Sequence, residues 1–374
     1  MFKLLNKLIK FISFGKFYIG LKKDILIFDE QASSFFENYL NVNQFNFLYT
    51  RREKFEIRIF FYTIIKDGYK NFGKNYLYNY IKKFKPKYVL SMWVLNKNLF
   101  TIKKNFPEIK IIIIQSHRYT KQTYEIISNF PQNSVDLFFT FRNLSNIKLK
   151  KFFWDANIVS IGSFKNNHYY KLVQKFNKIL YFSEYKLGRF TYDEKNILKI
   201  LNKYCDKNNF KFDIQLRYNN TPSQYLKLLK ENKINNYDKI LNRKNYSSSY
   251  ENSNIYKILV LTNSTLIDEF ISNFKRVAIF SSHEEFDTQE YEIRNYGKNK
   301  DFHYQNPMYK ELLPENFSWT STLDEKKVFN VLDNVINCNN LDWNNHISKY
   351  KNRFLYDSDN KIFKEQMKKI GLII

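Results

Sequence analysis

The chain has 374 residues, enough for two domains of ordinary size, and its 44% hydrophobic and 19% aromatic residues exclude a disordered or fibrous protein. Lys and Arg number 61 against 36 Asp and Glu, a net charge of +25 that favours contact with phosphates, although a Lys- and Asn-rich genome would give the same balance. The basic residues are scattered along the chain, which argues against a dedicated nucleic-acid protein.

Residues 1–23 form the first predicted element. Their apolar residues are interrupted by Lys3, Lys7 and Lys10, so the segment is too polar to span a membrane. The pattern favours an amphipathic helix that lies on an anionic membrane, at the cytoplasmic face of the inner membrane. A helix docked on the protein's own core would have the same pattern.

The first half of the chain alternates short apolar runs with helical patterns, which is typical of parallel α/β units. Pro86 and Pro107 each precede a predicted strand, where they would end a helix. We predict strands at 24–29, 45–50, 88–93, 110–115, 136–141 and 157–162, and helices at 56–66, 71–84 and 97–106.

The same alternation continues in a second series. The polar, Ser-rich stretch 242–254 lies inside that series and is predicted to be a surface loop. We predict strands at 178–183, 212–217, 257–262 and 276–281, and helices at 189–206, 221–233, 264–275 and 324–337.

Gly162 falls at the junction of the two series. The predicted fold class is therefore α/β, with two doubly wound Rossmann-like domains facing across a cleft that binds ligands at the strand ends. The domains are expected at 24–165 and 175–342, and the helical residues 343–374 are expected to cross back to the first domain.

The clearest candidate for a phosphate site is the junction at 258–270, where an apolar strand leads through Asn263, Ser264 and Thr265 into a helix that contains Glu269. Free N–H groups and a partial positive charge at a helix start can bind a diphosphate. Simple helix capping by Thr265 with Asp268 would leave the same pattern.

Three further residues follow strands. Arg217 could pair with phosphate oxygens, or form an exposed salt bridge. Asp29 is placed to act as a general base on an acceptor hydroxyl, or to cap a helix, and His117 titrates near neutral pH, as a base should.

Other site chemistries find no support in the sequence. GxGxxG, phosphate-loop, HExxH and GxSxG motifs are absent, and Cys205 and Cys338 form no metal or disulfide pattern, so a reducing cytosol fits best. The Asp-x-Asp at 357–359 is interpreted as a helix cap. We expect neither a cofactor nor a metal.

The ordered stretches ILIFD, FPEIKIIIIQSHR, IGSFKNN, ILYFS, IQLR and TNSTLIDEF together resemble the bacterial surface carbohydrate biosynthesis proteins. That family is similar to two-domain B-fold glycosyltransferases and to CDP-glycerol glycerophosphotransferases. The resemblance covers residues 24–337 and implies that the turn at Gly162 lets the chain leave the first sheet and line the cleft. It assigns to the interdomain cleft Gln115, Arg118, Gly162, Ser163, Asn166 and Asn167.

The resemblance implies a metal-independent transferase that moves a sugar or polyol-phosphate from a nucleotide-activated donor to a surface glycan or lipid-linked acceptor. A nucleotide-sugar epimerase of the same fold and a non-catalytic scaffold of a glycan assembly complex are the alternatives. His117 stands where the family usually has Gly, and Asn96 and Asn98 stand where it has an Asp-Asn pair, which favours the scaffold. Retention of Arg217, Ser264, Thr265 and Glu269 favours transfer.

Overall fold

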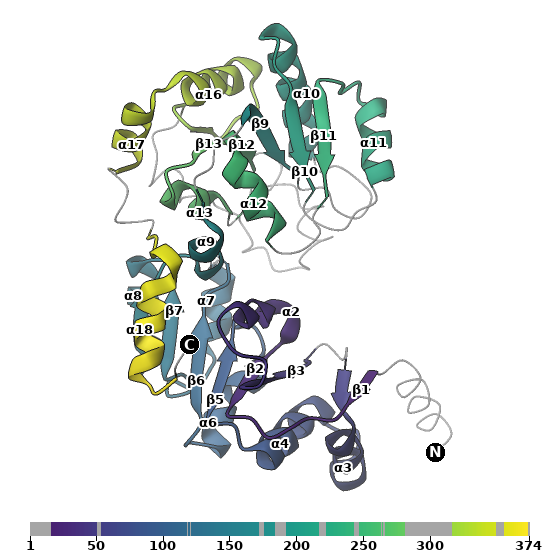
Figure 1. Ribbon diagram of the computed structural model, residues 1–374, viewed down its shortest axis with the longest axis vertical. Helices are drawn as coiled ribbons and strands as arrows, with labels where there is room; N and C mark the ends of the chain where they lie inside the picture. The colour runs from purple at the N-terminus through teal and green to yellow at the C-terminus, as the bar shows by residue number, and fades with distance from the viewer. Residues whose placement is uncertain are drawn as a thin grey trace. The chain divides into compact units, whose positions relative to one another are not determined.

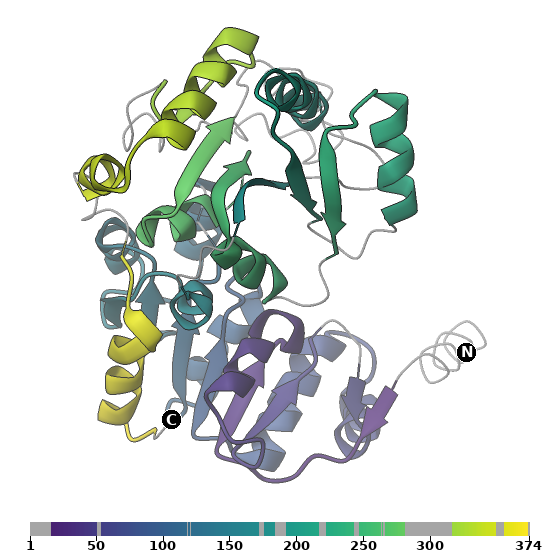
Figure 2. The ribbon, with the colours of Figure 1, turned by 45° about the horizontal axis from the view of Figure 1, so that its top comes forward.

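A computed structural model of the chain divides into two compact units, which are residues 1–165 with 359–374, and residues 166–358 (Figures 1 and 2). Each unit is described by itself. The structure describes residues 16–50, 54–117, 119, 121–171, 176–183, 192–216, 222–242, 247–262, 264, 266–280, 316–348 and 355–372.

The first unit is built on a six-stranded sheet in which every strand pair is parallel. Helices cover both faces, so most strand residues are apolar and buried, as a parallel sheet requires. The strand order is β3 (Phe45–Leu48), β2 (Ile25–Phe28), β5 (Tyr88–Ser91), β6 (Lys110–Ile114), β7 (Leu137–Thr140) and β8 (Asn157–Ser160).

Two short strands lie outside that sheet, and the first falls within residues 1–23, where an amphipathic helix was predicted; the rest of that prediction, up to residue 15, lies outside the described residues. β1 (Lys16–Tyr18) and β4 (Lys54–Glu56) pair in parallel, and Glu56 then caps α3 (Ile57–Asp67) by accepting the Ile59 N–H at 2.8 Å. The other oxygen of Glu56 accepts from Arg58 at 2.6 Å. A fully buried carboxylate therefore fixes the start of α3, which packs on α4 (Phe72–Phe84).

The smaller helices of the first unit follow its strands. Beyond β2 come α2 (Glu30–Ser33) and η1 (Ser34–Asn38), and the connection from β5 to β6 contains α5 (Lys97–Phe100) and α6 (Ile102–Asn105). The later connections contain α7 (Lys121–Ser128) and α8 (Asn143–Lys150).

The end of the chain returns to the first unit through η4 (Ser358–Asn360) and α18 (Lys361–Lys369). Phe363 of α18 is fully buried, with its ring centroid 4.5 Å from that of Phe164 and 5.0 Å from that of Phe139. Asn360 donates to the Phe164 carbonyl at 2.8 Å. These contacts make α18 part of the first core.

The second unit is also built on a six-stranded parallel sheet. Its core combines the buried strands with the helices that cover them. The strand order is β11 (Tyr237–Leu241), β10 (Phe212–Gln215), β9 (Phe176–Phe182), β12 (Tyr256–Leu261), β13 (Arg276–Phe280) and β14 (Trp319–Thr320).

The described helices of the second unit include one that the sequence analysis missed. The stretch 242–254 was predicted to be a surface loop, but α12 (Ser248–Ile255) occupies much of it and buries Ser248, Ser249, Ser253 and Asn254. The others are α9 (Phe164–Tyr169, which begins in the first unit), α10 (Tyr192–Lys207), α11 (Pro222–Glu231), α13 (Leu266–Ser272), α16 (Glu325–Asn337) and α17 (Asn340–Ser348).

Fewer residues return to the first unit than the predicted segment 343–374 contains. Trp343 and Ile347 of α17 are buried in the core of the second unit, and Trp343 donates its indole N–H to the Phe274 carbonyl at 2.8 Å. Residues 359–374 alone join the first unit. The correction follows from these two apolar side chains, which hold α17 to the second sheet.

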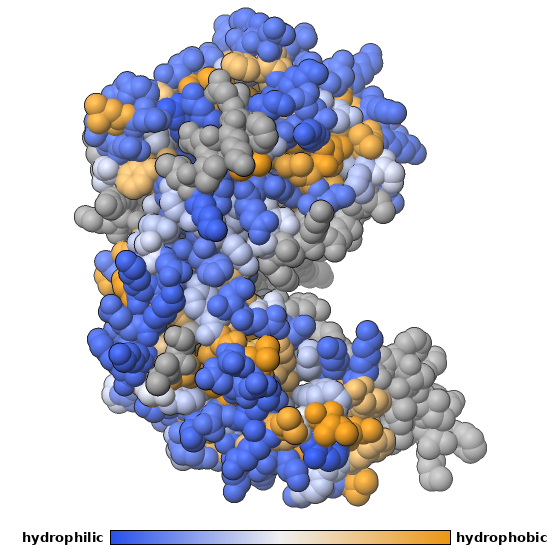
Figure 3. All heavy atoms as spheres, in the orientation of Figure 1, coloured by the Kyte–Doolittle hydropathy of each residue, from blue (hydrophilic) through white to orange (hydrophobic). Residues whose placement is uncertain are grey.

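The surface of the first unit includes an apolar area near β1 and α3, visible as a hydrophobic patch in Figure 3. Exposed side chains in this region include Ile19, Leu21, Phe61 and Ile65, of which Ile65 is 84% exposed. Among the described residues, no helix is long and apolar enough to cross a membrane.

Candidate functional site

The strand order of each sheet marks one crevice at its carboxyl edge. In the first unit the chain runs from β2 to β3 on one side and then to β5 on the other, so the order reverses between β2 and β5. In the second unit it reverses between β9 and β12. Ligands of doubly wound sheets bind outside the carboxyl ends of the strands at such reversal points.

Asp29 follows β2 directly, at the reversal point of the first sheet. Its φ angle is +67°, unusual for a residue with a side chain, and the side chain is 1% exposed. Thr50, which follows β3, donates its hydroxyl to Asp29 Oδ2 at 2.9 Å. In this conformation the predicted base is thus buried and accepts a hydrogen bond from Thr50.

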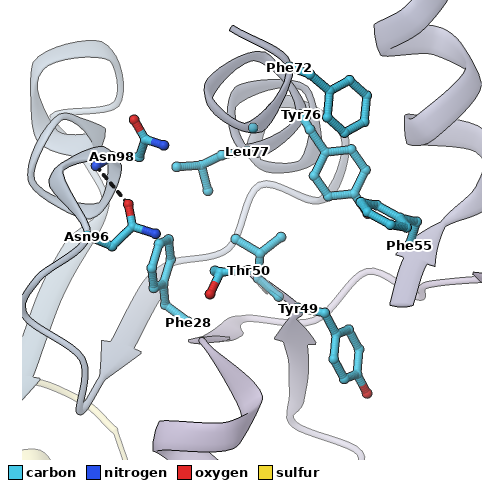
Figure 4. Close-up of a pocket in the computed structure, with 11 residues that line it drawn as sticks. Phe28, Tyr49, Thr50, Phe55, Phe72, Tyr76, Leu77, Asn96 and Asn98 are labelled. Atoms are coloured by element: carbon cyan, nitrogen blue, oxygen red, sulfur yellow. Dashed lines mark hydrogen bonds between the residues drawn. The ribbon is translucent and has the colours of Figure 1, made fainter. Parts of the chain in front are cut away.

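Beside this pair lies a cavity of about 90 Å³, which the sequence analysis did not predict (Figure 4). It lies between the ends of β2 and β3, the loop that follows β5, and the start of α4. Its lining residues include Phe28, Leu48, Thr50, Tyr76, Asn96 and Asn98. The sequence analysis had singled out Asn96 and Asn98 as departures from the family pattern, and both line this cavity.

His117 follows β6, two strands from β2 and therefore roughly 10 Å away along the same edge. Its Nδ1 lies 2.9 Å from Ser116 Oγ, while Nε2 has no protein partner among the described residues. Burial, with a smaller contribution from the charge of Lys165, lowers the pKa of His117 below its usual value of 6.5. The imidazole is neutral at neutral pH, and when Nδ1–H donates to Ser116, Nε2 can accept a proton.

Gln115 holds the backbone around His117. Its side-chain amide donates to the His117 carbonyl at 2.9 Å, and its side-chain oxygen accepts the Phe141 N–H at 2.9 Å. His117 is not among the residues with positive φ, so histidine fits this position without the backbone geometry that glycine permits. Arg118 lies outside the described residues.

The chain leaves the first sheet through a turn at Gly162, the residue that the sequence placed at this junction. Gly162 has a φ of +73°, a value that favours glycine, and Ser163 after it is buried. Within the second unit, the Asn166 amide donates to the Glu269 carbonyl at 2.8 Å, and Asn167 Oδ1 accepts the Asp357 N–H at 3.2 Å. Asn166 and Asn167 are buried and help to position the backbone.

In the second unit, Ser264 lies where β12 ends, beside the reversal point. Its Oγ accepts the Leu266 N–H at 3.3 Å and its carbonyl accepts the Ile267 N–H at 3.1 Å, so it caps α13. Glu269, in the first turn of α13, is buried. The other predicted donor contacts, Arg217, Asn263 and Thr265, lie outside the described residues.

The other side of the same reversal point contains a buried polar cluster that the sequence analysis missed. Ser183, which follows β9, donates its hydroxyl to Glu194 Oε1 in a short hydrogen bond, and Tyr225 donates to the same oxygen at 3.1 Å. Glu194 is fully buried in the first turn of α10. A Glu after a predicted helix start is common, so only the position of Ser183 after a strand could have indicated the cluster.

Lys275 lies at the other end of α13, between the helix and β13. It is buried, and its Nζ donates to Ser253 at 2.6 Å and to Asn254 Oδ1 at 2.7 Å. Burial lowers the pKa of Lys275 to about 7, although the negative charge of Glu269 acts in the opposite direction. Lys275 is therefore only partly protonated at neutral pH, and it lies close enough to Glu269 for the two side chains to interact electrostatically.

Metal-ligating side chains do not gather at either edge: no group of three or more His, Cys, Asp or Glu that could hold a metal occurs among the described residues.

Comparison with known sequences gives one family. The family described as "putative O-antigen biosynthesis protein" matches residues 119–371, which is more than half of the chain. No curated protein sequence matches.

Comparison with solved structures gives the fold. The UDP-GlcNAc 2-epimerase of Neisseria meningitidis, solved with UDP-GlcNAc, is 13% identical, with 92% of this chain and 99% of that chain covered and a TM-score of 0.54. MnaA of S. aureus, solved with UDP, is 12% identical over 94% and 98%, with a TM-score of 0.57. The wall teichoic acid polymerase TagF is 13% identical over 94% and 89%, with a TM-score of 0.55. The chain thus has two Rossmann-like units of the GT-B type, as predicted.

Proposed function

We propose that this chain, which belongs to the O-antigen biosynthesis protein family, is a transferase that moves a sugar or polyol-phosphate from a nucleotide-activated donor to a surface glycan acceptor. The observation that carries the proposal is the distribution of polar side chains. In both sheets they gather at the carboxyl edge, at or near the point where the strand order reverses.

The second unit would bind the donor. Ser264 and Ser183 flank its reversal point, and the nucleotide diphosphate would lie at the start of α13, with Asn263, Thr265 and Arg217 as further contacts. Glu269 would act on the ribose or the transferred group. MnaA and the Neisseria epimerase, which have the same fold, were solved with UDP and with UDP-GlcNAc.

The first unit would bind and activate the acceptor. His117 Nε2 would take the proton from the acceptor hydroxyl as its oxygen forms the new bond to the transferred carbon or phosphorus. The bond from that atom to the leaving nucleotide phosphate breaks, and its electron pair stays on the phosphate. The low pKa of His117 keeps the base unprotonated before this step.

Contact with an anionic membrane is part of the proposal. Exposed apolar residues near β1 and α3 lie close in sequence to the exposed Lys16, Lys22, Lys66 and Lys70. Apolar side chains beside lysines favour an anionic bilayer surface. Phe61→Ser with Ile65→Ser should release the protein from phosphatidylglycerol vesicles in a sedimentation assay, whereas Leu341→Ser, at an exposed site of the second unit, should not. Equal release by both variants would reject this surface.

Calorimetric titration with UDP, CDP, GDP and CMP tests the transferase proposal. We expect one nucleotide to bind clearly more tightly than the others, because a donor site recognises the base as well as the phosphates. Incubation of the corresponding activated sugar alone then separates the enzymes, since an epimerase changes the sugar without an acceptor. A chain that binds none of the four nucleotides would be the scaffold.

A further inference from the structure

The cavity at the reversal point of the first sheet has a composition that differs from that of the chain. The protein has a net charge of +25, but none of the described residues that line the cavity is charged. Recognition of a phosphate or carboxylate group relies on charged donors or on several converging N–H groups. The described lining residues therefore suit a neutral moiety.

The walls of the cavity are aromatic and aliphatic. Figure 4 shows Phe55, Phe72 and Tyr76 on one side of Leu77, and Asn96 and Asn98 on the other side, with Phe28 next to Asn96. Phe28, Phe55 and Tyr76 are buried, whereas the half-buried Tyr49 and Phe72 have exposed ring surface that can contact an apolar surface such as the C–H face of a pyranose ring.

The polar side of the cavity has unused hydrogen-bonding capacity. Asn96 Oδ1 accepts the Asn98 N–H at 3.0 Å, which orients the first amide. Among the described residues, neither the Asn96 NH₂ group nor the Asn98 side-chain amide has a protein partner. An aliphatic chain seated here would exclude water from these amides and leave them unpaired, at a cost in free energy. A ring that carries hydroxyl groups would pair with them.

Gly73 borders the cavity at a position where neighbouring atoms leave room for a side chain. It lies in the first turn of α4 and lines the cavity, and a Cβ added there would meet no atom within 4 Å. Alanine is the better helix former, so glycine gains nothing from the helix. A larger side chain can therefore be placed at this exposed part of the lining without a clash at Cβ.

We propose that this cavity seats a neutral pyranose ring of the acceptor glycan, with its C–H face on the aromatic walls and its hydroxyl groups on Asn96 and Asn98. The inference rests on the proposed function, in which the first unit binds the acceptor. It narrows the acceptor to a glycan whose recognised unit has no charge. Thr50 lines the cavity and donates a hydrogen bond to Asp29, so this sugar would lie at the sheet edge that also contains His117.

Saturation-transfer NMR with the full chain tests the inference. The probes are the methyl pyranosides of glucose, galactose and mannose, with glucuronic acid and farnesol as the charged and aliphatic alternatives. At least one neutral pyranoside should give a signal that Gly73→Leu, which adds a bulky side chain to the cavity lining, reduces at least tenfold. Lys83→Leu, an exposed change of similar size on α4, should keep it.

Asn98→Leu separates the two kinds of occupant, because it keeps the side-chain size and removes the amide. A bound sugar should lose at least tenfold in affinity, whereas a bound farnesol chain should bind equally or better. No signal from any neutral pyranoside, or a signal that Gly73→Leu leaves intact, would overturn the inference, as would preferred binding of farnesol or glucuronic acid.

The transferase proposal and the sugar site can be tested separately. Nucleotide titration of Gly73→Leu should give the wild-type affinity, because the donor is assigned to the other unit. A protein that binds pyranosides but no nucleotide would contradict the transferase and leave a sugar-binding site. A protein that binds a nucleotide but no neutral pyranoside would contradict only the sugar site.

Discussion

The two sheets share one architecture but differ at their reversal points. In the first unit, the crevice beside β2 opens into a cavity whose described lining residues are all uncharged. In the second, the crevice beside β9 is built on the fully buried carboxylate of Glu194, which is bonded to Ser183 and Tyr225. The parallel sheet fixes where a ligand binds, and the few residues after each strand decide what kind of ligand it is.

Loss of the proposed base of the first unit should have the largest effect. His117→Ala should slow transfer by roughly 10²- to 10⁴-fold, the usual contribution of a general base, without changing nucleotide affinity. Release of nucleotide in the presence of extracted acceptor measures this rate. His168→Ala, a histidine on α9, is the control. A rate within threefold of wild type would remove His117 from the mechanism.

The same residue predicts the pH profile. A base must be unprotonated, and the pKa of His117 is lowered below 6.5, so the rate should be constant around neutral pH and fall only at more acidic pH. A rate that still rises between pH 7 and pH 8 would point to another group.

The buried cluster of the second unit should carry the next effect. Glu194→Ala leaves the hydroxyls of Ser183 and Tyr225 without their acceptor, and should lower the free energy of unfolding of that unit by about 3–5 kcal/mol. Glu194→Gln keeps an acceptor oxygen and should cost about half as much. Urea unfolding measures both, and equal losses would show that the hydrogen bonds are not the cause.

Ser264 and Thr265 test the donor side. If they contact the diphosphate, Ser264→Ala with Thr265→Ala should weaken nucleotide binding by roughly 5- to 150-fold, which corresponds to about 1–3 kcal/mol. Ser264 already caps α13, so the melting temperature should fall as well, through a cap loss of about 0.5–2 kcal/mol. A lowered melting temperature with unchanged affinity would leave only the cap.

Lys275 should make the stability of the folded chain depend on pH. Its pKa is about 7 in the folded chain and near its usual value of 10.5 in the unfolded one, so the unfolded state binds more protons between these values. The folded state should gain stability as pH rises from 7 to 10, by at most about 1.4 kcal/mol per pH unit relative to Lys275→Met. A difference between the two proteins that does not change with pH would mean that Lys275 stays charged.

Long apolar runs made the fold predictable. Each main strand of the first sheet, and β9, β10, β12 and β13 of the second, was predicted within a few residues, because strands buried on both faces read as continuous apolar stretches. β11 was missed because this edge strand, with the sequence YDKIL, has no buried residue. α12 was missed because its serines, which suggest a loop, are buried.

The candidate site was only partly predictable. Asp29, His117 and Ser264 each follow a strand, a position that sequence alone can locate. The cavity could not be predicted, because Phe55 and Tyr76 read as ordinary core residues and come together only through the packing of α4 beside β2 and β3. The open space above Gly73 likewise has no signature in the sequence.

The most direct test of the account measures both ligands on two variants. Gly73→Leu should lose the neutral pyranoside and keep the nucleotide, and Ser264→Ala with Thr265→Ala should lose the nucleotide and keep the pyranoside. That crossed result would show that the two sheet edges bind different chemistry independently. Loss of both ligands in either variant at an unchanged melting temperature, or loss of neither ligand in both variants, would contradict the assignment of one ligand to each unit.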